Sequence, residues 1–430
     1  MTAPTASRQR AWAGGAIVGL ALLAFGGMRP EDGSGTFFVL LGLASAGYLV
    51  ALVQIASRPG PSGRALLACA LVALVWRLPL VLAPPEPAAD LRRYVWDAHL
   101  VRAGLSPYAV VPADPAYAHL RTAESWPVNN PDVPSPYPPG AQLFFLAATA
   151  AGESARALKL AALLCDALLG LVVWRSLLAA GANPGWVLAY LWNPLVSLEV
   201  ARHGHVDVVG ALFLALAALA LARGRTLPAV LAFVVSVAVK PLPVVLLPLF
   251  WRRVRPRDLL AGAGVLLGLY LPFAARGHLP IGSVPEVIQR FRFNGPIFSG
   301  LASLAGPVGA AASAVGVGLL AAIWAQRRLS PASPAAWAWP MAATLLCAPL
   351  VYPWYLVWLA PFLVASQTLP LAVWTVSILG TYVAWQRPGL PWGVPASVLL
   401  AEYGALLAAA LWTWRGRLTW PPSRSPTPPA

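Results

Sequence analysis

The chain has 430 residues, of which 59% are hydrophobic and only 10% are charged, and its mean hydropathy is +0.69. This composition excludes an ordinary soluble globular protein. The net charge of +15 does not indicate nucleic-acid binding, because the basic residues form short clusters between apolar runs, as the positive-inside rule requires. The three cysteines all lie in apolar runs and form no disulfide or metal-binding pattern.

The N-terminal part of the chain contains three apolar runs, each long enough to cross about 30 Å of hydrocarbon. They cover residues 11–28, 36–56 and 64–84. The first run follows Arg8 and Arg10 and has no clear cleavage site after it, so we expect an uncleaved signal-anchor span. Arg58 and Arg64 lie between the second and third runs, and they place this connection on the cytoplasmic side together with the N-terminus. The third run then ends on the extracytoplasmic side.

Residues 84–139 form the longest polar interruption of the chain. Six of the fifteen acidic residues belong to it, namely Glu86, Asp90, Asp97, Asp114, Glu124 and Asp132. A chain this poor in carboxylates has concentrated them in one loop. We predict that this loop lies outside the cytoplasm and carries the chemistry, with Asp90 as its most important side chain.

Further apolar runs follow the loop. They cover residues 139–152, 157–180, 257–275, 297–325, 334–350, 354–367, 369–386 and 394–414. The basic residues that we assign to the cytoplasmic side are Arg156, Lys159, Arg327, Arg328, Arg415 and Arg417. The segment 276–296 then comes out on the extracytoplasmic side, despite its arginines.

Two segments do not fit this simple alternation. The run 226–251 has arginines at both ends and carries Lys240 followed by Pro241 at its middle. We expect a re-entrant or broken-helix pair there, with its tip on the extracytoplasmic side, and we interpret 186–206 in the same way. Such backbone is tolerated in a membrane only where it is buried in protein or lines a wet cavity, so a cavity is implied.

The sequence therefore predicts an all-α, polytopic membrane protein with about 12 full spans and one or two re-entrant or broken-helix segments. We divide it into two N-terminal spans (1–63), a transmembrane catalytic module (64–414) that includes the loop 84–139, and a Pro- and Ser-rich tail (415–430). The tail is expected to be disordered and cytoplasmic.

Within the loop, Asp90, Tyr94 and Asp97 are spaced to share one face of a helix. Arg93 precedes Asp97 by four residues, so Asp97 is also explained as a paired charge. Asp90 has no such local partner and lies close to the membrane surface, where a lipid-borne substrate arrives. Asp90 is therefore our candidate general base for an acceptor hydroxyl; a solvated loop acid or a helix N-cap is the alternative.

Six motifs along the chain resemble a known class of enzymes. In order they are DLRRYVWDAHLVRAGLSPY, SPYPPGAQLFF, WNPLVSLEVARHGHVD, VKPLPVVLLP, RFRFNGPIFSGL and VYPWYLVW. Each motif alone is weak, but their order and spacing from about Arg77 to Trp358 resemble the polyprenol-phosphate-sugar-dependent glycosyltransferases of the membrane-embedded GT-C class. The resemblance is greatest to the bacterial family 87 and the related mannopyranosyltransferases. The chain departs from the usual pattern by having two spans ahead of the one that bears the loop.

The resemblance implies a lipid-linked sugar donor, an inverting transfer outside the cytoplasm, and an essential acid in the first large loop, which Asp90 matches. The leaving group of such a donor is a phosphate, which needs cations. Lys240, Arg290 and Arg292 are the candidates, since they can make charge-assisted hydrogen bonds to phosphate. A lysine in mid-membrane is costly and is functional by default, whereas the two arginines are also explained as headgroup anchors.

His203, His205 and Asp207 have an HxHxD spacing of residue types that bind metal ions. It places three ligands together only if the backbone is extended, so we favour a structural role or a contact to sugar or phosphate, and we assign no metal ligand. Asn193 and Glu199 lie in the same irregular segment and are expected to line the same cavity, because their polar groups need partners in low dielectric.

Tyr352, Trp354 and Tyr355 begin an apolar run. An aromatic belt at the membrane interface explains them, and stacking on a sugar ring or on isoprenoid is the functional alternative. Arg77, Asp166 and Glu402 lie within spans, and internal ion pairing explains them as well as a site does.

These features together predict an integral-membrane hexosyltransferase, with mannose as the favoured sugar. Its partners would be a polyprenyl-phosphate-linked donor, a lipid, glycan or protein acceptor, and membrane lipid. No cofactor is required; a divalent metal such as Mg²⁺ or Mn²⁺ is compatible with the chemistry, but no motif indicates one. We expect a multi-pass protein of the cytoplasmic membrane with both termini in the cytoplasm. A flippase for a polyprenyl-linked sugar is the alternative, and it would need no base.

Overall fold

The computed structural model describes most of the chain. The described residues are 3–57, 63–85, 89–275, 279–386 and 393–419, with residues 3–11 and 416–419 described by backbone alone. Arg58 and residues 420–430 of the expected tail lie outside the described residues, as do Glu86 and the side chains of Arg8, Arg10 and Arg417.

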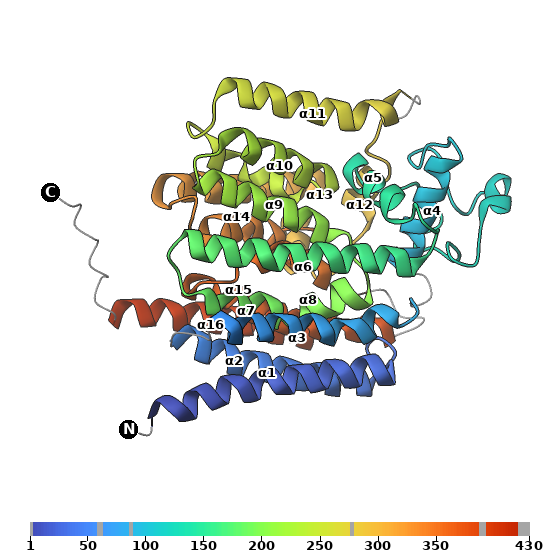
Figure 1. The fold of residues 1–430 in the computed structure, drawn as a ribbon. Helices are drawn as coiled ribbons and strands as arrows, with labels where there is room; N and C mark the ends of the chain where they lie inside the picture. Colours follow the sequence, from blue (N-terminus) through green and yellow to red (C-terminus); the bar gives the residue numbers. More distant parts are fainter. Residues whose placement is uncertain (1–2, 58–62, 86–88, 276–278, 387–392, 420–430) are drawn as a thin grey trace.

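The described residues form a bundle of helices, and the long helices lie side by side along a common direction (Figure 1). The long helices are α1 (Ala3–Met28), α2 (Gly35–Ser57), α3 (Gly63–Leu82), α6 (Ala155–Ala179), α11 (Pro256–Ala274), α13 (Pro296–Arg328) and α16 (Ala396–Thr419). By length and composition, seven stretches of the described residues are able to cross a membrane; they lie in α2, α3, α6, α11, α13 and α16 and in Ser366–Gln386. The predicted all-α membrane fold is confirmed, while the count of about twelve spans stays a prediction.

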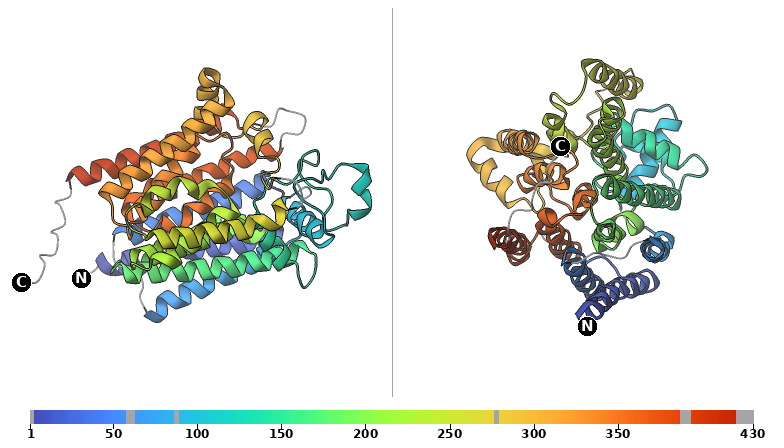
Figure 2. Two further views of the ribbon diagram at one scale, coloured as in Figure 1. Left: turned by 90° about the horizontal axis from the view of Figure 1, so that it is seen from above. Right: turned by 60° about the vertical axis from the view of Figure 1, so that its left-hand side comes forward.

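Shorter and irregular helices make up the remainder of the bundle. They include α4 (Asp90–Arg102), α5 (Pro139–Ala148), α7 (Val187–Leu191), α8 (Pro194–Val196), the π-helix η3 (Ser197–Arg202), α9 (Asp207–Ala222), α10 (Thr226–Val239), the 3₁₀-helix η4 (Leu242–Phe250), α12 (Val284–Arg290), α14 (Pro334–Leu346), the 3₁₀-helix η5 (Pro353–Trp358), α15 (Leu369–Ser377) and the 3₁₀-helix η8 (Ile378–Gln386). Helix α4 and its loop lie at one end of the bundle, opposite to the end where α1 begins and α16 stops (Figure 2).

The prediction of a span at 139–152 is wrong. Helix α5 has ten residues, which extend about 15 Å, only half of what a span needs. Directly after it, Thr149 and Glu153 bind Arg102 of α4, at 2.8 Å each. The chain thus stays at the loop end of the bundle, where the backbone N–H of Ala155 donates to Glu124 of the loop (3.1 Å).

This correction changes the side assigned to Arg156 and Lys159, which lie at the start of α6. Lys159 is buried, and its Nζ donates to the carbonyl of Ala83 (2.7 Å), just before the loop. The prediction that these two residues mark the opposite end of the bundle is therefore wrong. An apolar helix packed under a loop has the same composition as half a span, so composition alone does not distinguish the two.

The segment 186–206 is broken, as predicted, but it runs through the bundle instead of turning back. Helix α7 ends at Leu191, and Asn193 caps α8 by accepting from the backbone N–H of Leu195 (3.0 Å). Helix α9 was not predicted; it starts at Asp207, the last residue of the polar HGHVD motif. Helix α9 has 16 residues, fewer than the usual length of an apolar run that spans a membrane.

The broken pair predicted at 226–251 is present. Helix α10 ends at Val239, because Pro241 pushes the preceding residue out of helical geometry and Lys240 is extended. The chain then returns as η4. Its return brings Trp251 to the last turn of α13, where Gln326 donates to the Trp251 carbonyl (3.4 Å).

An ion pair inside the bundle joins α3 to α6. Arg77 and Asp166 are both fully buried, and the Arg77 Nε lies 2.7 Å from Asp166 Oδ2. Tyr190 of α7 donates a further hydrogen bond to Asp166 (2.5 Å). Of the two alternatives left open for Arg77 and Asp166, the structure shows the internal ion pair.

Replacing Asp166 with Leu should destabilise the protein by about 3–5 kcal/mol, because it leaves a buried guanidinium without its counter-charge. The double variant Arg77→Met/Asp166→Leu should recover most of this loss. Unfolding titrations with SDS in mixed micelles measure both, and the exposed Arg175→Met of the same helix serves as the control. A double variant as unstable as the single one would contradict the pairing.

Candidate active site

Asp90 begins α4, where the positive end of the helix dipole favours a carboxylate. Its Oδ2 accepts a hydrogen bond from the hydroxyl of Tyr137 (3.1 Å), and its Oδ1 accepts one from the amide of Asn129. Burial raises the pKa of Asp90, while the nearby charge of Lys240 and the two hydrogen bonds oppose this shift. A buried carboxylate that keeps a raised pKa is a stronger base than a solvated one.

His205 brings the irregular segment to Asp90. Its Nδ1 lies 3.6 Å from Asp90 Oδ2, and its ring stacks on Trp354 with the centroids 4.2 Å apart. The turn that carries it depends on Gly204, whose φ of +66° is unfavourable for other residues. The π-helix η3, a form frequent at functional sites, precedes this turn.

Lys240 and Asp207 form an ion pair beside Asp90. The Lys240 Nζ lies 2.8 Å and 2.7 Å from the two oxygens of Asp207, and the indole N–H of Trp358 donates to the same carboxylate (2.7 Å). The ammonium also lies 5.0 Å from the ring centre of Tyr355 and 5.9 Å from that of Tyr137. Tyr137 is thus the link between the cation and the candidate base.

A column of stacked rings leads from His205 away from the carboxylates. Trp354 stacks on His205, Tyr352 on Trp354 at 4.4 Å, and Phe293 on Tyr352 at 4.5 Å. Tyr355 lies against the column at 5.8 Å from Tyr352. The three aromatic residues singled out in the sequence therefore gather around one histidine of the site.

Two of the predicted residues in α4 serve packing. Asp97 is buried and binds Arg93 (3.3 Å), Ser135 (2.5 Å) and Gln142 (3.0 Å). Its contact with Arg93 is the ion pair that the sequence offered as an alternative to a site role. Tyr94 is fully buried and stacks on Phe145 at 4.2 Å. Both residues hold α4 against the loop and α5, and they thereby fix the position of Asp90 at the start of α4.

Three further predicted residues lie apart from the cluster. Asn193 binds Tyr48 (3.3 Å) and Thr375 (2.9 Å) inside the bundle, where it fixes the break in the helix. Arg292, two residues after α12, donates to carbonyls at the end of that helix, including that of Ile288 (3.1 Å). Arg290 is exposed at the end of α12.

Four residues of the site escaped the sequence analysis, namely Asp32, Asn129, Tyr137 and Trp358. Tyr137 and Trp358 lie within the motifs SPYPPG and VYPWYLVW, so the motifs were a usable signal for both. Asp32 carries no local signal, because it meets its partner Arg202 (3.1 Å) from 170 positions away.

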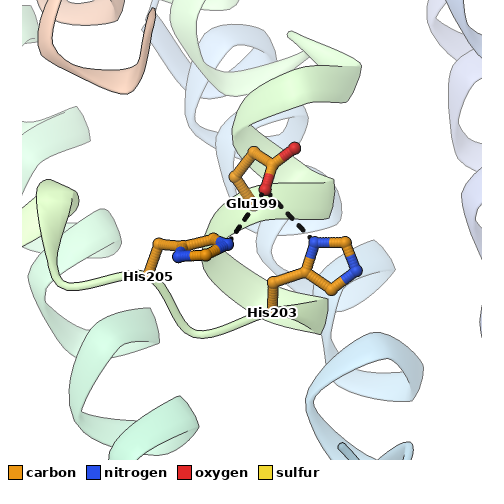
Figure 3. A group of neighbouring side chains, drawn as sticks. All are labelled: Glu199, His203 and His205. Carbon is orange, nitrogen blue, oxygen red and sulfur yellow. Dashed lines mark hydrogen bonds and ion pairs between the residues drawn. The ribbon is translucent and has the colours of Figure 1, made fainter. Parts of the chain in front are cut away.

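A second group of side chains, whose nitrogen and oxygen atoms are able to act as metal ligands, lies next to Asp90. Glu199, His203 and His205 each direct one ligand atom toward the others, and these atoms all lie within 4.8 Å of one another (Figure 3). All three residues are buried. Asp207, the third residue of the HxHxD pattern, is turned to Lys240 instead.

An apolar cavity of about 160 Å³ lies elsewhere in the bundle. Its lining includes Val173, Ala215, Trp337 and Phe362, and it shares no residue with the cluster around Asp90. The chemistry available at the cluster is that of a buried base, a cation and stacked aromatic faces, an arrangement suited to moving a proton beside a developing negative charge.

Gly204→Ala should destabilise the protein by about 1–2 kcal/mol through its left-handed backbone, and by about 1–3 kcal/mol more through overpacking. A Cβ at this position would lie 2.7 Å from Leu91 in α4. The control is Gly224→Ala, which has a similar φ of +68° and open space around it. Equal losses of stability in SDS unfolding titrations would contradict the close packing of this turn against α4.

Comparisons with known proteins place the chain in a family. A family model described as Alpha-(1->6)-mannopyranosyltransferase, N-terminal domain, matches residues 7–254. The crystal structure of ArnT from Cupriavidus metallidurans bound to undecaprenyl phosphate is similar, with 16% sequence identity, a TM-score of 0.48, and coverage of 82% of this chain and 71% of that one. A comparison with curated proteins gives no match.

The matched range is more than half of the chain, and it contains Asp90, the two histidines, Asp207 and Lys240. The family match confirms the resemblance that the motifs indicated. It also favours an enzyme over the alternative of a flippase. The chain belongs to the alpha-(1->6)-mannopyranosyltransferase family and is a membrane-embedded glycosyltransferase of the GT-C class.

Proposed function

We propose that the enzyme transfers a hexose, specifically mannose, from a polyprenyl phosphate carrier to an acceptor hydroxyl on the extracytoplasmic side of the cytoplasmic membrane. The observation that carries this proposal is Asp90, which lies at a helix start with only 11% of its side chain exposed and with the Lys240–Asp207 pair beside it. A base and a cation side by side are what an inverting transfer with a phosphate leaving group requires. The side of the membrane is inferred from the basic clusters and from the loop lying opposite to the start of α1 and the end of α16.

In the proposed reaction, Asp90 accepts the proton of the acceptor hydroxyl while the hydroxyl oxygen attacks the anomeric carbon. The bond between that carbon and the phosphate oxygen breaks, and the phosphate leaves with the bonding electrons on the opposite face. A β-linked donor therefore gives an α-linked product. Positioning of the two substrates and neutralisation of charge supply most of the acceleration.

Lys240 is the proposed partner of the leaving phosphate. An ammonium group has three donors, and two of them point at Asp207. The third remains for a phosphate oxygen, and the lysine side chain keeps 16% of its surface exposed, so an incoming group is able to reach it.

The aromatic residues at the site suit a sugar. Trp354 and Tyr355 are half-buried, so part of each ring stays open beside His205 and Lys240. Aromatic faces pack against the C–H faces of hexoses and exclude water from charged neighbours. We therefore assign the sugar of the donor to the space between Asp90 and these rings.

Replacement of Asp90 with Asn should lower the transfer rate by about 10²–10⁴-fold, since it removes the general base and keeps the size of the side chain. The assay follows radiolabelled sugar from polyprenyl-phosphate-mannose and polyprenyl-phosphate-glucose in proteoliposomes with membrane acceptors. Asp132→Asn, an exposed acid of the same loop, should retain the wild-type rate. Full activity of Asp90→Asn would remove the base from this position, and transfer of glucose alone would overturn the choice of mannose.

Tyr137→Phe should reduce kcat by about 10–100-fold, because it deletes a hydrogen bond to a charged group while it keeps the ring contacts to Tyr94 and Phe145. The change should fall on kcat more than on KM, since the bond orients the base. Tyr117→Phe, in the same loop, is the control. A variant with unchanged kcat would disprove this orienting role.

A further inference from the structure

We propose that Glu199, His203 and His205 bind one divalent transition-metal ion of the zinc type, next to Asp90. The ligand atoms are Glu199 Oε2, His203 Nδ1 and His205 Nε2. They come from the π-helix η3 and the turn that follows it, and all three converge on one point (Figure 3). Metal binding is independent of the proposed transfer reaction, and it is measured without it.

The spacing of these atoms suits a metal. Glu199 Oε2 lies 3.2 Å from His203 Nδ1 and 3.4 Å from His205 Nε2. Ligands about 2.0–2.1 Å from a tetrahedral zinc ion lie about 3.3–3.4 Å from one another. An ion therefore fits between the three atoms with small movements of the side chains, and its fourth position is left for water or substrate.

Both histidines also have a carboxylate behind them. His203 Nε2 lies 3.1 Å from Asp32 Oδ2, and His205 Nδ1 lies 3.6 Å from Asp90 Oδ2. Metal-binding histidines characteristically donate their other ring N–H to a carboxylate, which fixes the tautomer and the ring. At His203 the carboxylate is close enough for such a contact, whereas at His205 it faces the ring from a longer distance, and opposite ring nitrogens face the metal position.

The charges of the cluster favour a dication. Asp32, Glu199 and Asp90 supply three negative charges, and Arg202, 3.1 Å from Asp32, supplies one positive charge. Asp207 and Lys240 neutralise each other. A divalent ion offsets both of the remaining negative charges. In a buried place such a balance matters, because uncompensated charge is costly there.

The ligand set selects the kind of ion. Two imidazoles and one carboxylate suit zinc and its transition-metal neighbours, while Mg²⁺ and Ca²⁺ prefer oxygen ligands. Tyr382 donates to the outer oxygen of Glu199 (2.8 Å), which leaves Oε2 to face the metal. A metal on His205 Nε2 keeps the proton on Nδ1, the ring nitrogen that faces Asp90 Oδ2 at 3.6 Å.

The test uses the full-length protein in detergent, with any affinity tag removed and bound metal stripped by a chelator. Co²⁺ is the probe, because its visible d–d absorption reports tetrahedral nitrogen and oxygen ligands. Metal content after desalting gives the stoichiometry. The variants are Glu199→Gln, His203→Gln and His205→Gln, and the matched control is His119→Gln, an exposed histidine of the loop.

We expect about one Co²⁺ per chain in the wild type and in His119→Gln, displaced by Zn²⁺ but not by Mg²⁺, and its loss in the three ligand variants. Asp32→Asn keeps all three ligands and should weaken binding by about 10–100-fold, which tests the site even where a ligand variant fails to fold. Folded wild-type protein that gives no Co²⁺ absorption overturns the proposal. Binding that persists in the ligand variants, or that Asp32→Asn leaves unchanged, overturns it as well.

Discussion

The ion pair between Lys240 and Asp207 holds together the helical segments that form the site, at one end of the bundle. The pair joins the residue that follows α10 to the first residue of α9, and Trp358 adds a third helical segment through its indole N–H. Breaking a buried ion pair costs about 3–5 kcal/mol, so these segments are held together firmly. The tip at Lys240 then packs against the ring of Tyr137, whose hydroxyl binds Asp90. The position of the candidate base therefore depends on an interaction in which Asp90 takes no part.

The way in which each buried carboxylate is neutralised separates structure from function. Asp166 and Asp97 are each held by an arginine, and each joins two parts of the fold. Asp90 and Glu199 are held instead by hydroxyl, amide and imidazole groups, which stabilise a negative charge without cancelling it. Negative charge thus gathers at the loop end of the bundle. A fold that buries charge at such cost gains reactivity there, because a base or a metal ligand must keep its charge available.

Much of this arrangement could be predicted from the sequence wherever the signal was local. The break at Lys240 was predictable because Pro241 ends the helix and arginines flank both ends of the run. Asp90 stood out because it begins a polar loop in an apolar chain. The role of Asp32 could not be predicted, since its contact with Arg202 spans 170 positions and no local pattern encodes such a distance. Helix α5 was misassigned because burial under a loop and burial in lipid select the same apolar residues.

The site is assembled from segments that are all interrupted helices or loops. Asp90 starts a helix, His205 follows a π-helix, Lys240 ends a helix at a proline, and Trp354 begins a 3₁₀-helix. Regular helices in a membrane satisfy their own backbone, so they offer few polar groups to a substrate. Breaks supply those groups, but they need support from outside their own segment. The stacked rings and the Lys240–Asp207 pair give that support, and this is why the most irregular part of the chain is also buried and closely packed.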